Sequence, residues 1–301
     1  VEYKDFIGAV WYRRSFPISE DHLNGRVLLH FEAVNYYCQV WINGQDMGTH
    51  RGGYSPFSFD ITDKVKAGEN TVTLYVENDV RDPLQPRGKQ SEVFHSHGCD
   101  YTRNTGIWQT VWLEYVPETY IEKYRCIPSP ENGSVNMQVF FAGDYCQGML
   151  QAQVTYQGKT VGSKCVQVIG NTISFSISLS ERHFWEPGKP ELYDIILSAQ
   201  FRNGAMDEVA GYFGLRSVSL ADHTVLINGK PVFQRLVLDQ GYYPDGIYTA
   251  PSDDALRRDI ELSMALGFNG GRMHEKVFER RYLYWADKLG LLVWGELPSA
   301  Y

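Results

Sequence analysis

The last third of the chain alternates between strand-like and helix-like patterns, and this alternation limits the possible folds more than any other feature. Residues 232–238 form an apolar-rich run that predicts a strand buried on both faces. Ser252 stands where a helix N-cap belongs, apolar residues follow it at helical spacing, and Gly267 marks the helix end. The pattern then predicts a strand over 268–273, a helix over 279–289 and a strand over 291–294. Strands and helices at this spacing predict parallel βα units.

Three strands and two helices are too few to close a barrel of this type. A complete (β/α)₈ barrel needs about 250 residues, whereas Tyr301 follows shortly after the third predicted strand. We therefore expect this sequence to be the N-terminal piece of a longer protein, cut inside a barrel domain.

The residues before this region have the character of two antiparallel β domains. Short runs of alternating polar and apolar residues are separated by turn residues, and Asn43-Gly44 is a strong hairpin signal. We expect one sandwich over residues 1–117 and a second over 118–217, the latter with the strand number of an immunoglobulin-like architecture but without its Cys…Trp…Cys pattern. Residues 81–105 form a long polar loop, and such loops in compact domains are usually functional or disordered.

Composition excludes several classes of function. A net charge of −8 argues against nucleic-acid binding, and no apolar stretch is long enough for a membrane span. Aromatic residues make up 14% of the chain, which is typical of β-rich proteins and also of proteins that stack sugar rings on aromatic side chains. Val1 is not an initiator methionine; if a leader was removed, a periplasmic or secreted location is expected, and otherwise a cytoplasmic one.

Cysteine and histidine spacing gives little support for a disulfide framework or a metal site. The five cysteines are irregularly spaced and form no CxxC motif. His95, His97 and Cys99 could share one face of a strand, but a zinc site needs a further ligand and more regular spacing. We therefore expect no bound metal.

Several short motifs, in order, carry a resemblance that covers the whole chain. The chain resembles glycoside hydrolase family 2, which includes β-galactosidases, β-glucuronidases and β-mannosidases. The motifs are Trp41-Ile42-Asn43-Gly44, the stretch from Gly48 to Phe57, Thr105-Gly106-Ile107-Trp108-Gln109, Phe213-Gly214-Leu215-Arg216, the stretch from Leu226 to Pro231, Gly267-Phe268-Asn269 with Arg272, and Ala286-Asp287-Lys288-Leu289-Gly290.

This resemblance implies a fold and an activity. The fold is a sugar-binding-type jelly-roll sandwich (1–117), an immunoglobulin-like sandwich (118–217) and the start of a (β/α)₈ TIM barrel (218–301). The activity is that of a retaining exo-β-glycosidase, most similar to β-galactosidases, which acts on a carbohydrate substrate without a cofactor and can form a homo-oligomer. Two glutamates perform the chemistry, and the acid/base follows an asparagine. The chain has no Asn-Glu pair, so we expect both catalytic glutamates to lie downstream and this chain alone to be inactive.

Candidate substrate-binding residues follow from the position of barrel sites at the C-terminal ends of strands. Those positions are Asp239 after the first strand, Arg272 and His274 after the second, and Glu296 after the third. The resemblance implies that Arg272 orients the nucleophile, a structural ion pair being the alternative; the family's usual histidine position is occupied here by Glu275. It also implies that the loop over 81–105 reaches the barrel mouth and that Asp100 lines the sugar site, a solvated loop carboxylate being the alternative.

Two other functions remain open on the sequence. Jelly-roll sandwiches also occur as non-catalytic carbohydrate-binding modules, and serial β-sandwiches occur in structural or adhesive arrays. Parallel βα units with Arg272 at a strand end favour the glycosidase, because an array has no use for them.

Overall fold

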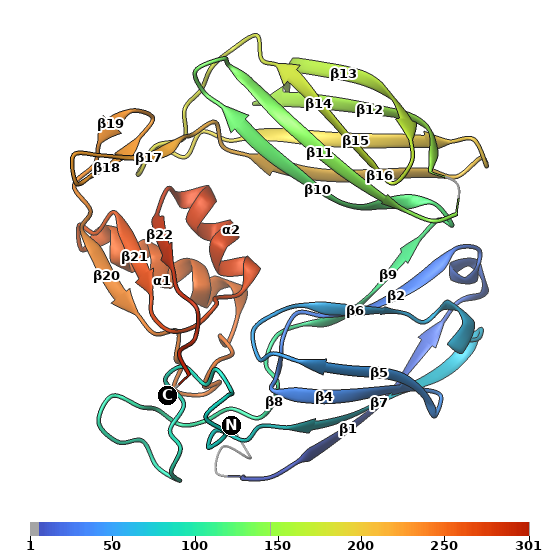
Figure 1. Ribbon diagram of the computed structural model, residues 1–301, viewed down its shortest axis with the longest axis vertical. Coiled ribbons are helices and arrows are strands. Elements are labelled where there is room, and N and C mark those ends of the chain that lie inside the picture. The colour runs from blue at the N-terminus through green and yellow to red at the C-terminus, as the bar shows by residue number, and fades with distance from the viewer. Residues whose placement is uncertain (1–5, 145, 301) are drawn as a thin grey trace. The chain divides into compact units, whose positions relative to one another are not determined.

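The computed structural model describes residues 6–144 and 146–300 of the chain. In this part the chain is mainly β, with two α-helices (Figure 1). It divides into two compact units. The first contains Val1–Tyr115, Leu236–Ala286 and Leu292–Tyr301, and the second contains Val116–Arg235 and Asp287–Leu291.

The N-terminal part of the first unit consists of two antiparallel sheets and a short strand pair. The sheets have the order β1-β7-β4-β5 and β6-β2-β9, and the pair is β3-β8. Two short 3₁₀ helices, η1 and η2, lie between strands. The bounds are β1 (Val10–Ile18), η1 (Glu20–Leu23), β2 (Arg26–Phe31), β3 (Val34–Asn35), β4 (Tyr37–Ile42), β5 (Gln45–Arg51), β6 (Phe57–Asp60), η2 (Thr62–Lys64), β7 (Gly68–Glu77), β8 (Gly106–Ile107) and β9 (Val111–Val116).

One hydrophobic core joins these two sheets. Alternate residues of β4 are fully buried, namely Cys38, Val40 and Ile42, and they pack with alternate residues of β2 and β7. Asn43 and Gly44 connect β4 to β5 with φ angles of +50° and +79°. Positive φ at both central positions is what a type I′ hairpin turn requires, so the predicted turn is confirmed.

Three parallel strands complete the first unit. They are β20 (Leu236–Asp239), β21 (Gly270–Met273) and β22 (Leu292–Gly295), and the register pairs Leu238 with Arg272 and Arg272 with Trp294. The predicted parallel arrangement is therefore confirmed. The prediction that 232–238 form a strand buried on both faces is wrong, because the strand begins at Leu236, β20 lies at the edge of this sheet, and Leu238 is 49% exposed.

Two helices connect the parallel strands. The first is α1 (Asp253–Ala265), in which the Ser252 side chain accepts a hydrogen bond from the Ala255 N–H, as the N-cap prediction requires. Gly267 follows the helix with a φ of +90°, the left-handed conformation that ends many helices. The second is α2 (Arg280–Leu289), whose buried residues are Tyr282 and Ala286. Leu283 of the same helix is 41% exposed.

The second unit contains two further antiparallel sheets with a shared core. Their orders are β10-β11-β14 and β13-β12-β15-β16, and the core includes Met137, Leu150, Ile177 and Leu197. The bounds are β10 (Tyr120–Ser129), β11 (Ser134–Ala142), β12 (Gln147–Tyr156), β13 (Lys159–Ile169), β14 (Thr172–Ser178), β15 (Tyr193–Phe201) and β16 (Met206–Phe213). The strands of both sheets are antiparallel, as the alternating pattern of this region predicts.

The segment that leads from these sheets toward β20 contains a small antiparallel sheet that the sequence analysis did not predict. Its strands are β17 (Val218–Ala221), β18 (Thr224–Ile227) and β19 (Lys230–Pro231). The β17–β18 turn is formed by Asp222 and His223, with φ angles of +47° and +64°. Neither is glycine, so the usual sequence signal for a two-residue hairpin is missing at this turn.

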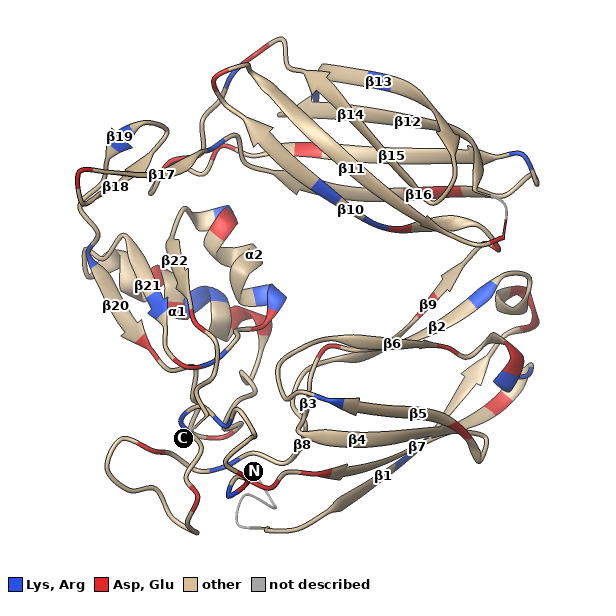
Figure 2. Ribbon diagram, in the orientation of Figure 1, with Lys and Arg blue, Asp and Glu red and all other residues tan. Residues whose placement is uncertain are grey.

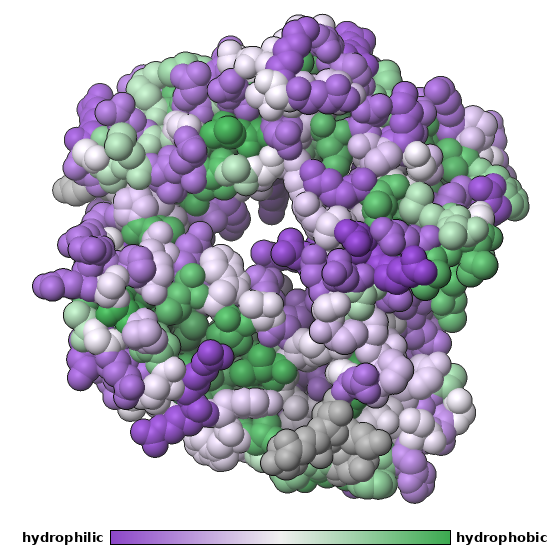
Figure 3. Space-filling view, turned by 180° about the vertical axis from the view of Figure 1, so that it is seen from behind, coloured by the Kyte–Doolittle hydropathy of each residue, from purple (hydrophilic) through white to green (hydrophobic). Residues whose placement is uncertain are grey.

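The surface has no single dominant character. Lys and Arg residues are interspersed with Asp and Glu over the ribbon (Figure 2), and hydrophilic side chains cover most of the face shown in Figure 3, with hydrophobic ones between them. Among the described residues no helix has the length and apolar character that crossing a membrane requires. All five cysteines are free thiols.

Candidate active site

The C-terminal ends of β21 and β22 bring three of the predicted site residues into contact. Glu296, just after β22, accepts a hydrogen bond from Arg272 Nε, and its other oxygen lies 2.8 Å from His274 Nδ1. The same oxygen accepts the Glu275 N–H at 3.1 Å. Parallel strands place their C-terminal residues at one edge, and this explains why residues 24 positions apart in sequence meet here.

The Glu296 carboxylate is held in its charged form. Burial acts to raise its pKa, but hydrogen bonds from Arg272, His274 and the Glu275 N–H outweigh burial and keep the pKa below its ordinary value. Glu275 adopts a φ of +51°, which is uncommon for a residue with a side chain. The Glu296 carboxylate therefore serves as an anionic hydrogen-bond acceptor at neutral pH.

Asp239, after β20, has a different environment. Its Oδ1 accepts the Gly241 N–H at 2.8 Å, and its carbonyl oxygen accepts the His274 N–H at 2.8 Å. Burial raises the pKa of Asp239, against the hydrogen bond from Gly241 and the nearby charge of Lys276. The backbone thus joins Asp239 to the strand-end cluster without an ion pair to Arg272 among the described contacts.

Lys276 is a buried cation beside this edge that the sequence analysis missed. It is 3% exposed, and its Nζ donates to the carbonyl oxygens of Gly241 at 2.6 Å and Tyr248 at 3.1 Å. The Nζ also lies 4.7–4.9 Å from the ring centroids of Trp108, Tyr248 and Phe278, a cation–π arrangement. A lysine three residues after the end of β21 gives no sequence signal of such an environment.

The long loop between β7 and β8 is fixed by a buried amide network. Gln90 Oε1 accepts hydrogen bonds from Asn35 Nδ2, Asn78 Nδ2 and the Asn104 N–H at 3.0, 3.1 and 2.9 Å. Gln90 and Asn35 are both 0% exposed. Because buried amides that find partners rigidify a structure, this network orders a loop whose sequence was compatible with disorder.

The ordered loop contacts the segments that follow the parallel strands. Lys89 Nζ lies 3.4 Å from Glu275 Oε1, and the N–H groups of Arg87 and Gly88 both donate to the Ser299 carbonyl at 3.1 Å. Tyr101 packs on Tyr242 with ring centroids 4.8 Å apart. The hydroxyl groups of Tyr54 and Tyr248 are 2.9 Å apart. The loop is therefore in direct contact with the segments that follow β21 and β22.

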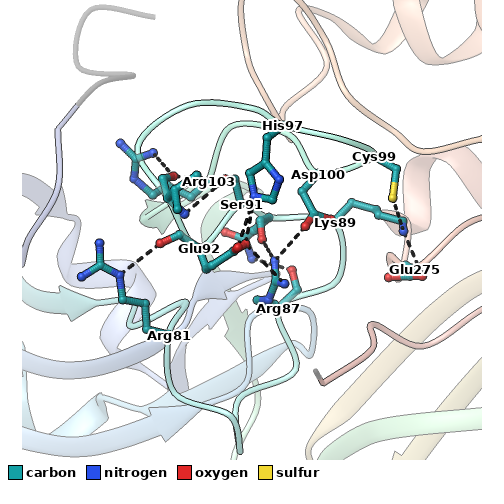
Figure 4. Close-up of polar contacts among 12 residues, drawn as sticks. Arg81, Arg87, Lys89, Ser91, Glu92, His97, Cys99, Asp100, Arg103 and Glu275 are labelled. Atoms are coloured by element: carbon teal, nitrogen blue, oxygen red, sulfur yellow. Dashed lines mark hydrogen bonds and ion pairs between the residues drawn. The ribbon is translucent and has the colours of Figure 1, made fainter.

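Asp100 lies in this loop beside a guanidinium (Figure 4). Arg87 Nη1 is 3.6 Å from Asp100 Oδ2, and Arg87 Nη2 is 3.5 Å from Glu92 Oε2. The Asp100 side chain is 15% exposed. Asp100 is thus a half-buried, charge-paired residue rather than a fully solvated carboxylate.

The structure brings together a different set of possible metal ligands in this loop from the set considered in the sequence. Of the three side chains considered from sequence, His97 lies in a group of possible ligands with Glu92 and Asp100, while Cys99 Sγ lies 3.6 Å from Lys89 Nζ. Arg87 already supplies positive charge to both carboxylates of the group. A cation would have to compete with this guanidinium, so the residues fit an ion poorly.

The chemistry of the whole arrangement is that of binding rather than proton transfer. Glu296 is paired with Arg272, Glu275 with Lys89, and Asp100 with Arg87. Carboxylate oxygens accept hydrogen bonds, and guanidinium and ammonium groups donate them. Such a set suits a ligand rich in hydroxyl groups.

The chain is similar in sequence to several known proteins. Residues 2–117 match the family model described as "Glycosyl hydrolases family 2, sugar binding domain". A β-galactosidase of Thermoanaerobacter pseudethanolicus is 29% identical over 98% of this chain and 40% of its own length. A β-glucuronidase of Felis catus is 25% identical over 99% of this chain and 49% of its own length. The chain thus spans less than half the length of these relatives.

A solved structure gives the same fold over nearly all of the chain. The β-glucuronidase from Ruminococcus gnavus in complex with C6-substituted uronic isofagomine superposes with a TM-score of 0.84 at 20% identity, over 98% of this chain and 51% of that protein. The described part of this chain therefore has the fold of about half of that protein. Residues 2–117 thus match the sugar binding domain of glycoside hydrolase family 2, and the whole chain is similar to relatives named β-galactosidase and β-glucuronidase.

Proposed function

We propose that the chain is the N-terminal part of a retaining exo-β-glycosidase that removes a terminal β-linked sugar. The observation that carries the proposal is the contact of the β7–β8 loop with the strand ends, through Lys89–Glu275 and the Ser299 carbonyl. An exo-acting enzyme needs a pocket closed at one end, and a loop over the open edge of parallel strands supplies such a wall.

The domain arrangement belongs to the same proposal. Residues 1–117 are a jelly-roll sandwich, residues 118–217 an immunoglobulin-like sandwich, and residues 218–301 the first βα units of a TIM barrel. The parallel register of β20, β21 and β22 supports the barrel assignment, and the order of motifs along the sequence supports the rest.

Five residues have proposed roles at the substrate. Asp100 accepts hydrogen bonds from hydroxyl groups of the terminal sugar, and Glu296, His274 and Asp239 line the strand side of the pocket. Arg272 stabilises the charged nucleophile that a later strand contributes, in addition to its pairing with Glu296. A permanently charged guanidinium favours the ionised form of a neighbouring carboxylate.

The sugar is proposed to be galactose, as in the relative from Thermoanaerobacter pseudethanolicus named a β-galactosidase. The relative from Felis catus is named a β-glucuronidase, so glucuronic acid is the second candidate. Parallel assays of the intact protein with nitrophenyl β-galactoside and nitrophenyl β-glucuronide separate the two.

The proposal predicts different activities for this chain and for the intact protein. We expect the pure 301-residue chain to show no turnover of either nitrophenyl glycoside, because it has no Asn-Glu pair, and the intact protein to hydrolyse one of them with retention. Proton NMR of the first-formed anomer measures the stereochemistry. Turnover by the chain alone, or an inverted product from the intact protein, contradicts the proposal.

A further inference from the structure

Two short hydrogen bonds connect Lys276 to Asp239 of the candidate active site. Lys276 Nζ donates to the Gly241 carbonyl oxygen at 2.6 Å, and the Gly241 N–H donates to Asp239 Oδ1 at 2.8 Å. Gly241 is therefore held at both of its backbone polar groups, by the ammonium at its carbonyl and by the carboxylate at its N–H. The orientation of the Asp239 carboxylate thus depends on where the ammonium holds Gly241.

The turn at Gly241 lies directly against the lysine. Gly241 has a φ of +61°, and a Cβ added there would lie 2.7 Å from Lys276 Nζ and 2.7 Å from Phe278 Cζ. Because no side chain fits in this space, Lys276 and Phe278 fix the position of the turn after β20. Lys276 Nζ also donates to the Tyr248 carbonyl oxygen at 3.1 Å, and this bond holds a later residue of the segment between β20 and α1.

Charge also links the Lys276 and Asp239 side chains. Burial raises the pKa of Asp239, and the charge of Asp259 on α1 acts in the same direction, whereas the charge of Lys276 lowers the pKa. The Asp239 charge in turn favours the protonated form of Lys276. Without the ammonium, burial and Asp259 would together favour a protonated, neutral Asp239.

The other titratable groups around this pair do not replace the ammonium. Burial raises the pKa of Glu279, which precedes α2 and adds negative charge when it is ionised. Burial also raises the pKa values of the Tyr243, Tyr248 and Tyr282 phenols, which are therefore neutral at pH 7. Lys276 supplies positive charge to Asp239, whereas these four groups supply negative charge or none.

A purely structural role does not require a charge at position 276. A neutral side chain with N–H groups, such as that of glutamine, also donates to carbonyl oxygens. The ammonium is instead buried at a cost, because desolvation disfavours its charged form. A buried charge that is bonded to the backbone beside a candidate site is typical of groups that serve the site.

We propose that Lys276 is a positioning residue for Asp239, because it fixes the turn that orients the carboxylate and its charge keeps the carboxylate ionised. Asp239 then accepts hydrogen bonds from a ligand at neutral pH. When Lys276 is neutral, Asp239 binds a proton more readily, and one of its oxygens becomes a donor. The kinetic part of this inference rests on the proposed glycosidase function, whereas the protonation of Asp239 does not.

Carbon-13 NMR of the Asp239 carboxyl group in the 301-residue chain tests the coupling of the two charges. Aspartate is labelled at Cγ, and the Asp239→Asn variant assigns the signal. In the wild type we expect the signal to respond to pH twice, once when Asp239 loses its proton and again near pH 8, where Lys276 loses its own. In Lys276→Met the second response should vanish, and the pKa of Asp239 should rise by about 1 or more.

Two further variants separate this coupling from damage to the fold. Lys276→Arg keeps a positive charge, so its Asp239 pKa should lie nearer to the wild-type value than that of Lys276→Met. Lys123→Met is the matched control and should leave the Asp239 signal unchanged, because Lys123 Nζ lies 5.1 Å from the Phe140 ring centroid but belongs to β10 of the second unit. The wild-type titration needs no substitution, so it tests the proposal whether or not the Lys276 variants fold.

In the intact protein Lys276 and Asp239 should act as one unit. Lys276→Met and Asp239→Asn should each raise KM for the preferred nitrophenyl glycoside about tenfold, the range of a lost hydrogen bond to a charged group. The double variant should be no worse than the poorer single variant, because both substitutions remove the same charged acceptor. A lysine with a merely structural role predicts effects that add instead.

Three results overturn the proposal. They are a wild-type Asp239 signal that does not respond near pH 8, an Asp239 pKa that Lys276→Met leaves unchanged, and KM effects that add in the double variant. If the intact protein hydrolyses no glycoside, the proposed function fails, and the carboxyl titration still decides the role of Lys276.

Discussion

Lys276 illustrates how one buried side chain connects the amino-terminal sheets to the parallel strands within the first unit. Trp108, just after β8, and Tyr248, in the segment between β20 and α1, both have ring faces within 4.9 Å of its Nζ. Burial lowers the pKa of Lys276 to about 8, although the charges of Glu279 and Asp239 act to raise it. The ammonium is therefore still protonated at neutral pH, but at a cost to stability.

The lowered pKa predicts how stability depends on pH. Between pH 8 and 10.5, the folded and ordinary pKa values, the unfolded chain binds more protons than the folded one, so the free energy of unfolding rises with pH. The Lys276 contribution is at most about 1.4 kcal/mol per pH unit. Urea unfolding between pH 7 and 9.5 measures it, and Lys276→Met should flatten the rise. An unchanged slope in that variant would show that other groups cause it.

At the scale of one element, the β7–β8 loop has a polar sequence but a defined conformation, which hydrogen bonds and one close backbone contact maintain. Its polar composition predicted only that it was functional or disordered. In the structure, Gln90 collects three amide hydrogen bonds and Gly88 passes close to the strand-end segment. A Cβ added at Gly88 would lie 2.4 Å from the Glu275 carbonyl oxygen, and Gly88 has a φ of +58°.

Gly88→Ala should therefore detach the loop, whereas Gly98→Ala should not. Both glycines have positive φ, but a Cβ at Gly98 meets nothing within 4 Å. Each substitution costs about 1–2 kcal/mol for the backbone conformation, and the close contact at Gly88 adds about 1–3 kcal/mol. Hydrogen exchange over residues 86–92 and thermal unfolding measure the difference. Equal effects of the two substitutions would show that the contact with Glu275 is unimportant.

Across the whole molecule, signals within a few residues were predictable and long-range partners were not. The Asn43-Gly44 turn, the Ser252 cap and the glycine stop at Gly267 each follow from local backbone chemistry, and the structure confirms them. The β17–β18 hairpin was missed because Asp222 and His223 supply its positive φ without glycine.

In the candidate site, too, positions at strand ends were predictable from the sequence, whereas contacts between distant residues were not. The sequence predicts that Asp239, Arg272, His274 and Glu296 stand at the C-terminal ends of strands, but it does not predict which of them pair. The contacts of Lys89 with Glu275 and of Lys276 with three aromatic rings join residues from separate elements. No pattern along the sequence encodes such pairs, since each depends on how a long loop folds back.

The kinetics of two variants of the intact protein test most directly whether the loop and the strand ends form one sugar pocket. Asp100→Ala should raise KM and lower kcat/KM, because it removes a hydrogen-bond acceptor for the terminal sugar. Arg272→Ala should mainly lower kcat, by about 10²-fold or more, because its charge stabilises the reacting carboxylate. Steady-state rates with the preferred nitrophenyl glycoside measure both. Wild-type kcat and KM in both variants would contradict the shared pocket and place the substrate elsewhere.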